Sequence, residues 1–470
     1  MLFNSFAFLI FLPLFMIGYW STRGRARLWV MFLSSLVFYG WWDWRFLFLL
    51  LFSAIVDYSL GLLLESERDE GARHRLIVLS VVVNLGLLGF FKYFNFFADS
   101  AARLSESLGL PVTWTTLRIV LPVGISFYVF KTMSYTIDVY RRTQPAERDL
   151  LRFATFVVFF PELVAGPIVR ASRLLPQLNE DKRFDSARAL SGLSLICSGY
   201  VRKVVVADSL APLIDVRFAH PEAHSALSLL IGVYFYAFQI YCDFSGYSNI
   251  AIGVARILGF DFGINFDRPY FSRSFSEFWT RWHISLSSWL RDYLYIPLGG
   301  NRGGALFTVR NLMITMLLGG LWHGANWTFV AWGGLHGLYL VLQRVLGPVY
   351  QRMVRALRIP RAVSDVFLML LVFHLTCFAW VFFRAQSFAN AWKILSTIAA
   401  MGDLSPAAVD NKILVIKGGM LIAGLLLAEI VTLRSREESP ARRLAFAAAC
   451  VWILLLFGSF SGNTFIYFQF

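Results

Sequence analysis

Long apolar stretches, separated by short polar segments, run along almost the whole chain. A membrane-spanning helix needs about 20 mostly apolar residues. The pattern predicts helices over residues 4–21, 28–42, 45–64, 76–97, 113–135, 153–168, 188–207, 225–259, 308–324, 327–346, 364–385, 412–433 and 444–461. Several stretches are too short or too long for one simple crossing, and 225–259 fits one long helix or two, so we expect about 11 to 13 helices.

One central region, residues 268–305, departs from this pattern. It alternates charged side chains with indole rings, for example in Phe275–His283. Such a segment is too polar to face lipid, and irregular backbone at membrane depth is tolerated only inside protein or along a wet cavity. We therefore predict a re-entrant or surface-lying element here, within a single membrane domain over residues 1–470 whose polar catalytic region covers about 240–340.

Composition supports a polytopic membrane protein. Hydrophobic residues make up 57% of the chain and charged residues only 15%, against about 25% charged in average soluble domains. The formal net charge of +14 comes from cations in short loops between apolar stretches, where the positive-inside rule accounts for them. This excludes nucleic-acid binding as the reason for the charge. It also predicts that Arg23, Arg25 and Arg27 are cytoplasmic and that both termini are extracytoplasmic.

The run Gly319–Trp327 places His323 inside an apolar stretch. Ionisable groups at membrane depth are costly and usually functional, and a neutral imidazole can accept a proton near pH 7. Trp322 and Trp327 would supply rigid walls for a substrate. Asn326, three residues on, falls on nearly the same helical face and can orient the ring or a substrate carbonyl. The alternative is a packing histidine bonded to a backbone carbonyl.

Three further polar residues are candidates for the same site. His283 lies in the polar central region, and Ser287 follows one turn along; an interfacial histidine bonded to backbone is the alternative. Asp243 is a carboxylate inside an apolar stretch and must pair or meet water, which favours a structural or channel-lining role. His336 follows His323 by 13 residues, on the opposite face of any continuous helix, and is therefore interpreted as structural.

Other chemistries find little support in the sequence. No zinc-binding H-E-x-x-H or C-x-x-C pattern, serine-hydrolase elbow or phosphate-binding glycine motif is visible, so we predict neither a metal nor a permanently bound cofactor. The four cysteines are expected to be buried free thiols: Cys197, Cys242, Cys377 and Cys450. What remains is a set of histidines, amides and hydroxyls within a membrane. That set suits removal of a proton from a hydroxyl during acyl transfer.

The run Leu321–Gly324 around His323 resembles the signature of the membrane-bound O-acyltransferase family. Within that family, the resemblance is to the bacterial alginate O-acetyltransferase branch, and it extends over several segments. These are Pro161–Arg170, Tyr241–Asn249, Phe278–Arg302 and the ending Phe465–Phe470.

The resemblance implies a ring of tilted transmembrane and re-entrant helices around a central funnel, in the bacterial inner membrane. It implies that His323 is the catalytic histidine and His283 the second conserved one. The acyl group would come from a cytoplasmic thioester, acetyl-CoA, which is a substrate and not a resident cofactor. The acceptor hydroxyl would lie outside, on a partner acetyltransferase or carrier protein docked near Phe465–Phe470 that passes acetyl to an exported polysaccharide.

Three alternatives stay open at this point. The teichoic-acid branch of the same family would transfer D-alanine from a carrier protein. A polysaccharide or proton transporter would use His323 as a relay. A scaffold for an envelope export complex would need no chemistry at all.

Overall fold

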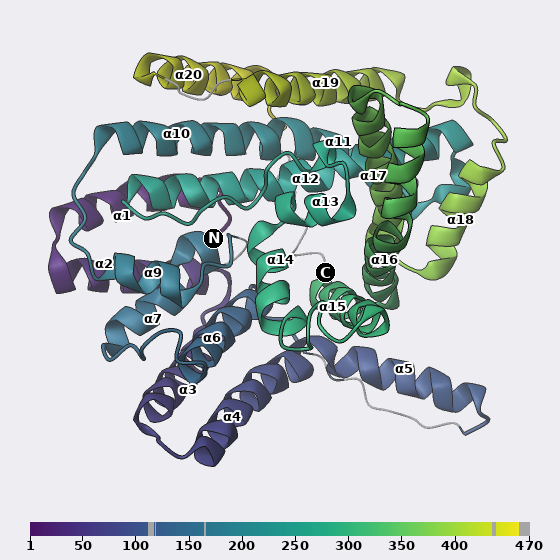
Figure 1. Ribbon diagram of the computed structural model, residues 1–470. Helices are drawn as coiled ribbons and strands as arrows, with labels where there is room; N and C mark the ends of the chain where they lie inside the picture. The colour runs from purple at the N-terminus through teal and green to yellow at the C-terminus, as the bar shows by residue number, and fades with distance from the viewer. Residues whose placement is uncertain (111–116, 118, 164–165, 435–438, 460–470) are drawn as a thin grey trace. The chain divides into compact units, whose positions relative to one another are not determined.

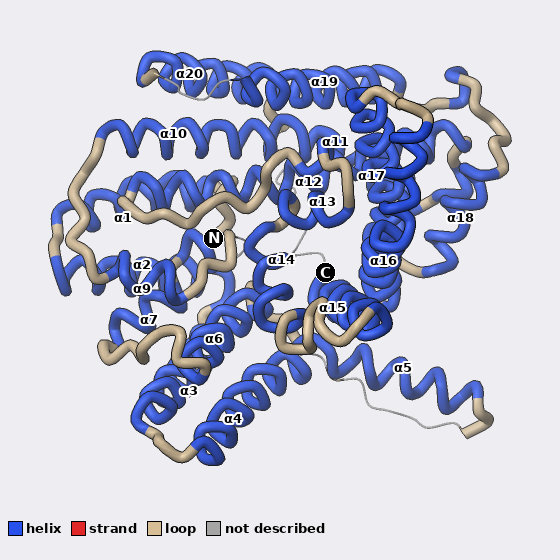
Figure 2. The backbone as a smooth tube through the Cα atoms, viewed as in Figure 1, coloured by secondary structure: helices blue, strands red, loops and turns tan. Residues whose placement is uncertain are grey.

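The computed structural model describes the whole chain except residues 111–116, 118, 164–165, 435–438 and 460–470. The described part is helical, with no strand (Figure 2). It divides into two compact units, one of Met1–Ile196 with Ile250–Gly263, the other of Cys197–Asn249 with Ile264–Phe470. We describe each unit by itself.

The described residues of the first unit form nine helices and parts of two more. They are α1 (Phe6–Ser21), α2 (Gly24–Asp43), α3 (Phe46–Ser66), α4 (Glu70–Leu88), α5 (Phe94–Ser107), α6 (Ile125–Tyr140), α7 (Leu150–Val158), α8 (Phe160–Leu163), α9 (Ala171–Leu178), most of α10 (Ser186–Tyr200) and the end of α12 (Ala226–Ile257). Helices α3, α4 and α6 pack together, and α3 and α4 run side by side (Figure 1).

The second unit contains the polar central region. Its helices are α11 (Asp208–Ala219), the body of α12, α13 (Phe275–Arg281), α14 (Ile284–Leu290), α15 (Ala305–His323), α16 (Trp327–Ala356), α17 (Arg361–Arg384), α18 (Phe388–Ala399), α19 (Lys412–Arg434) and α20 (Pro440–Phe457). Helices α16 and α17 run alongside each other (Figure 1). A core of buried aromatic and aliphatic side chains joins α12, α13, α16 and α17.

Nine helical stretches of the described residues are long and apolar enough to cross a membrane. They are Phe46–Ser66, Glu70–Ser107, Ser186–Ala219, Ala226–Ile257, Ala305–His323, Trp327–Ala356, Arg361–Arg384, Lys412–Val431 and Pro440–Phe457. The other four predicted stretches form α1, α2, α6 and α7, which are shorter or less apolar. The chain is therefore an all-α, multi-pass membrane protein, as the hydrophobic pattern predicts. The four cysteines are buried and free, also as predicted.

The structure refines the predictions for individual stretches. Of the two possibilities left open for residues 225–259, one helix, α12, is found. In the stretch 113–135, α6 begins at Ile125 and the described residues 119–124 before it are not helical, while residues 113–116 and 118 lie outside the described part. The stretch 153–168 does not form a single helix, because α7 ends at Val158 and the short α8 follows. The break precedes Pro161, which cannot donate a backbone hydrogen bond and clashes with the preceding turn of a helix.

Glycines allow α15 and α16 to approach at backbone distance. A Cβ on Gly320 would overlap the carbonyl oxygen of Phe329, and a Cβ on Gly333 would overlap that of Met316. Small residues permit such contacts between membrane helices. The close approach holds His323, the last residue of α15, against the first turns of α16.

Replacing Gly320 with alanine is expected to destabilise the protein by about 1–3 kcal/mol, because the added methyl group must push α15 away from α16. The matched control is Gly424→Ala in α19, where a Cβ meets nothing within 4 Å. The control should be neutral or slightly stabilising. Thermal unfolding of the two variants in the same detergent provides the comparison, and equal midpoints would contradict the close contact.

Candidate active site

His323 lies at the point where α15 ends, and its side chain is buried. Three aromatic rings stand edge to face with the imidazole. The ring centroids of Trp322, Trp332 and Phe383 lie 5.1, 5.0 and 5.2 Å from that of His323. Of the two aromatic walls predicted for this histidine, Trp322 contacts it, while Trp332 and Phe383 were not among the candidates.

His283 is fully buried and occupies the turn that joins α13 to α14. Its Nδ1 lies 3.3 Å from Oδ1 of Asn265 and 3.4 Å from Oγ of Ser285. An amide oxygen only accepts hydrogen bonds. The ring proton of His283 therefore lies on Nδ1, which donates a hydrogen bond to Oδ1 of Asn265. Nε2 then keeps its lone pair, and it has no hydrogen-bond partner in the part of the chain that the structure describes. His283 is therefore arranged to accept a hydrogen bond through Nε2.

Asn265 fixes this geometry. Its Oδ1 also accepts hydrogen bonds from the backbone N–H (3.1 Å) and the hydroxyl (2.9 Å) of Ser285, and its Nδ2 donates to Oγ of Ser248 at 3.0 Å. Phe244 stands edge to face with His283 at 4.5 Å. The polar run Tyr241–Asn249, noted in the sequence as an interruption in an apolar stretch, thus supports His283 from α12.

The two candidate histidines share one neighbour. The indole of Trp322 lies 6.0 Å from the ring of His283 and 5.1 Å from that of His323, centroid to centroid. The structure therefore brings together His283, Trp322 and His323, although 40 positions separate the two histidines in the sequence.

Two predictions based on helical spacing are wrong. Ser287 does not lie on a helical face with the ring of His283, because His283 has left-handed backbone angles and α14 begins only at Ile284. The Ser287 hydroxyl instead donates to the carbonyl of Trp279 at 2.6 Å. Asn326 does not share a helix with His323, because α15 ends there. Its side chain caps α16 by accepting from the Thr328 backbone N–H.

The remaining candidates are placed as follows. Trp327 begins α16 and is about half exposed. Asp243 is buried in α12, and its Oδ1 lies 2.6 Å from Nζ of Lys203. The same ammonium is 2.9 Å from Oδ1 of Asp208. Lys203 lies in a π-helical turn, Val201–Ala207, between α10 and α11. Asp243 thus forms an ion pair, as expected for the structural role favoured for it. The position of Lys203 within an apolar stretch could have suggested this cation as the partner.

A polar pocket of about 180 Å³ opens beside the polar run Tyr241–Asn249 of α12. Its lining residues come from the π-helical turn Val201–Ala207, α12, the loop before α13 and α19. They are Arg202, Tyr241, Ser245, Asn249, Phe266, Asp267, Arg268 and Glu429. Arg202 is 2.9 Å from Glu429, and the Tyr241 hydroxyl donates to the same carboxylate at 2.6 Å. Phe266, one wall of the pocket, stacks on His283 at 6.3 Å.

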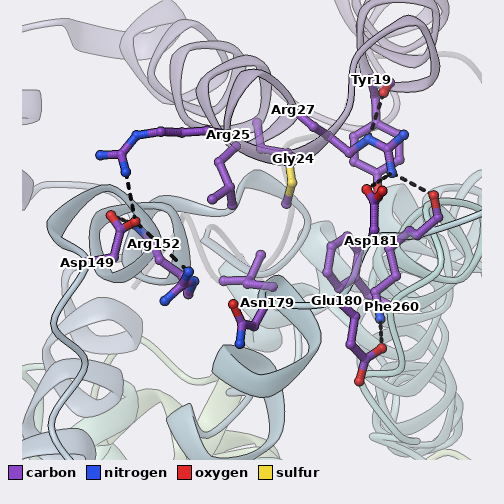
Figure 3. A pocket seen from close by; sticks show the side chains of 14 residues that line it. Tyr19, Gly24, Arg25, Arg27, Asp149, Arg152, Asn179, Glu180, Asp181 and Phe260 are labelled. Carbon is purple, nitrogen blue, oxygen red and sulfur yellow. Dashed lines mark hydrogen bonds and ion pairs between the residues drawn. The ribbon is translucent and has the colours of Figure 1, made fainter.

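A second pocket, of about 230 Å³, lies in the first unit and contains none of the predicted site residues (Figure 3). Arg25 reaches Asp149 at 3.4 Å and Arg27 reaches Asp181 at 3.8 Å. Lys182 pairs with Glu180. Because these cations are matched by carboxylates, the pocket is not strongly basic.

Burial lowers the pKa of His283 to about 3, against an ordinary value of about 6.5. Between these values the unfolded chain binds a proton that the folded protein does not, so stability falls as the pH drops below about 6.5. Thermal midpoints in detergent should therefore decline from about pH 7 to pH 4.5. His283→Asn removes this titration and should flatten the decline. An equally steep decline in the variant would contradict the assignment.

The comparisons with known proteins agree with each other. Residues 9–384 match MBOAT, the membrane-bound O-acyltransferase family. The chain is 44% identical to a probable alginate O-acetylase of Azotobacter vinelandii, over 92% of this chain and 84% of that protein. It is 34% identical to a peptidoglycan O-acetyltransferase of Helicobacter pylori, over 86% and 81%. It is 33% identical to a teichoic acid D-alanyltransferase of Streptococcus thermophilus, over 47% and 56%.

Proposed function

The chain belongs to the membrane-bound O-acyltransferase family, and on that premise we propose that it is an O-acetyltransferase acting in the O-acetylation of an exported polysaccharide such as alginate. The donor in this proposal is acetyl-CoA. The observation that carries it is the pair of buried imidazoles, His283 and His323, which both contact the indole of Trp322. The similarity to alginate O-acetylases over most of both chains supports the choice of acyl group and acceptor.

In the proposed reaction, His323 takes the proton of the acceptor hydroxyl as general base. The hydroxyl oxygen attacks the thioester carbonyl, the C–S bond breaks, and the leaving thiolate receives the proton from His323. A step through acetyl-His323 fits the same residues. His283, neutral at physiological pH because burial lowers its pKa to about 3, is a weak base. Its role is to accept a hydrogen bond through Nε2 and so align the acceptor or the thiol.

The proposal includes a direction of transfer. The thioester would enter from the cytoplasm and the acceptor hydroxyl from outside the bacterial inner membrane, on a partner acetyltransferase or carrier protein. Both termini would then be extracytoplasmic. The partner site suggested near Phe465–Phe470 lies outside the described residues. Basic loops on the cytoplasmic face would favour a donor that carries phosphates.

A thiol-release assay with the purified protein tests the donor. We expect free CoA to appear from acetyl-CoA when an acceptor is present. A protein that ignores acetyl-CoA but consumes a D-alanyl carrier protein would support the teichoic-acid alternative, which the similarity to a D-alanyltransferase over about half of this chain keeps in view. Polysaccharide or proton flux in proteoliposomes without thioester cleavage would support the transporter.

A further inference from the structure

The indole of Trp332 contacts a second histidine besides His323. Its centroid is 5.0 Å from the ring of His323 and 4.9 Å from the ring of His336. The expectation that His336 is remote from His323 assumed a continuous helix. Because the chain turns between α15 and α16, the two imidazoles instead contact the same indole.

His336 is fully buried in a cage of aromatic rings whose centroids lie 4.9–6.4 Å from its own. The cage consists of Phe275, Phe278, Trp279, Trp332, Tyr339 and Trp380. A phenylalanine would fill this position with similar ring contacts and without polar atoms. The presence of an imidazole therefore needs a reason other than packing.

Six buried polar atoms of this cluster have no hydrogen-bond partner among the described residues. These atoms are the two ring nitrogens of His336, the hydroxyl oxygen of Tyr339 and the indole Nε1 of Trp279, Trp332 and Trp380. Native proteins leave few such atoms unsatisfied, since an unmade buried hydrogen bond costs more than a made one contributes. Six in one cluster indicate that a small molecule completes the set.

The donor and acceptor counts indicate what that molecule is. An indole N–H only donates, and a neutral imidazole offers one donor and one acceptor. Donors therefore exceed acceptors, and the guest must accept hydrogen bonds. Because the ring centroids of the cage lie only 4.9–6.4 Å from that of His336, we infer a guest no larger than a water molecule. Buried waters commonly make about three hydrogen bonds to groups of this kind.

We propose that His336, Trp279, Trp332 and Tyr339 bind a buried water molecule, and that His336 is a positioning residue which holds Trp332 against His323. Trp332 also stacks on Trp380 at 5.6 Å and meets Phe383 at 5.1 Å. An indole held at its Nε1 by the bound water cannot rotate in this stack. It therefore keeps a fixed wall beside the catalytic imidazole.

The kinetic test, which rests on the proposed function, compares His336→Phe with His336→Gln. The phenylalanine variant keeps the ring contacts and removes both nitrogens. We expect it to lower kcat by roughly 10–100-fold, since small misplacements of a catalytic group are costly, with KM unchanged and the thermal midpoint equal or higher. Glutamine, which restores polar atoms, should recover part of the loss. His374→Phe, an exposed position on α17, should leave kcat as in the wild type.

Wild-type kcat in His336→Phe would overturn the proposal. A structural test does not depend on the acyl donor. Cryo-EM maps that resolve waters elsewhere in the protein should show density within hydrogen-bond reach of a His336 nitrogen, and this density should be lost in His336→Phe. No such density in the wild type would also overturn it. If the wild type releases no thiol from acetyl-CoA, the proposed function fails, while the density test still decides this inference.

Discussion

Replacing His323 with alanine is expected to lower the rate of acyl transfer by roughly 10²–10⁴-fold, the usual contribution of a general base. The imidazole is only 4% exposed, so neither bulk water nor buffer can readily take over its role. Glutamine at this position keeps a hydrogen-bonding group but cannot accept the proton, and it should lose as much activity as alanine. The measurement is thiol release from acetyl-CoA under saturating acceptor.

The control for folding is built into the same experiment. His374→Ala removes an exposed histidine whose Nδ1 lies 2.6 Å from the carbonyl oxygen of Leu370, in its own helix, and should retain full activity. The His323 variants should elute from size exclusion like the wild type. Acetylation at the wild-type rate by a folded His323→Ala protein would remove this residue from the mechanism.

Replacing Lys203 with methionine is expected to destabilise the protein by about 3–5 kcal/mol, the usual cost of removing one partner from a buried ion pair. The ammonium lies 2.6 Å from Asp243 and 2.9 Å from Asp208, and all three side chains are at most 5% exposed. Without Lys203, two carboxylates would stand close together inside the protein. Total stabilities are only about 5–15 kcal/mol, so much of the variant should be unfolded or aggregated after extraction.

A double variant separates charge from packing. Lys203→Met with Asp243→Asn removes one negative charge together with the positive one and should recover part of the lost stability. Lys393→Met, at an exposed position on α18, should stay within about 0.5 kcal/mol of the wild type. Thermal unfolding in detergent orders the four proteins. A Lys203→Met protein as stable as the wild type would show that the buried carboxylates do not need this ammonium.

The long helices were predictable because an apolar stretch of spanning length has few other stable states in a membrane. The errors fall where local signals compete. Residues 153–168 are apolar enough for one helix, but Pro161 interrupts it. Where the sequence left a choice open, between one helix and two in residues 225–259, the structure shows one.

The candidate residues of the site stand out in the sequence one at a time, but their arrangement in space does not. His323, His283 and Trp322 stand out because of residue type and membrane depth. Asn265 and Lys203, which orient His283 and neutralise Asp243, come from other elements, and spacing along a helix cannot find such partners. The same limit explains the wrong predictions for Ser287 and Asn326. Both predictions assumed a helix that continues through the neighbouring histidine, whereas α14 begins after His283 and α15 ends at His323.

The left-handed backbone of His283, with φ of 42°, restricts what can replace it. Residues branched at Cβ are strongly disfavoured there, whereas asparagine adopts these angles more readily. In a saturation mutagenesis library, Val, Ile and Thr at this position would therefore score as null through misfolding, whatever their effect on turnover. Only the His-to-Asn comparison reports on the imidazole itself, and a scan that ranks all substitutions together would overstate the effect of losing the imidazole.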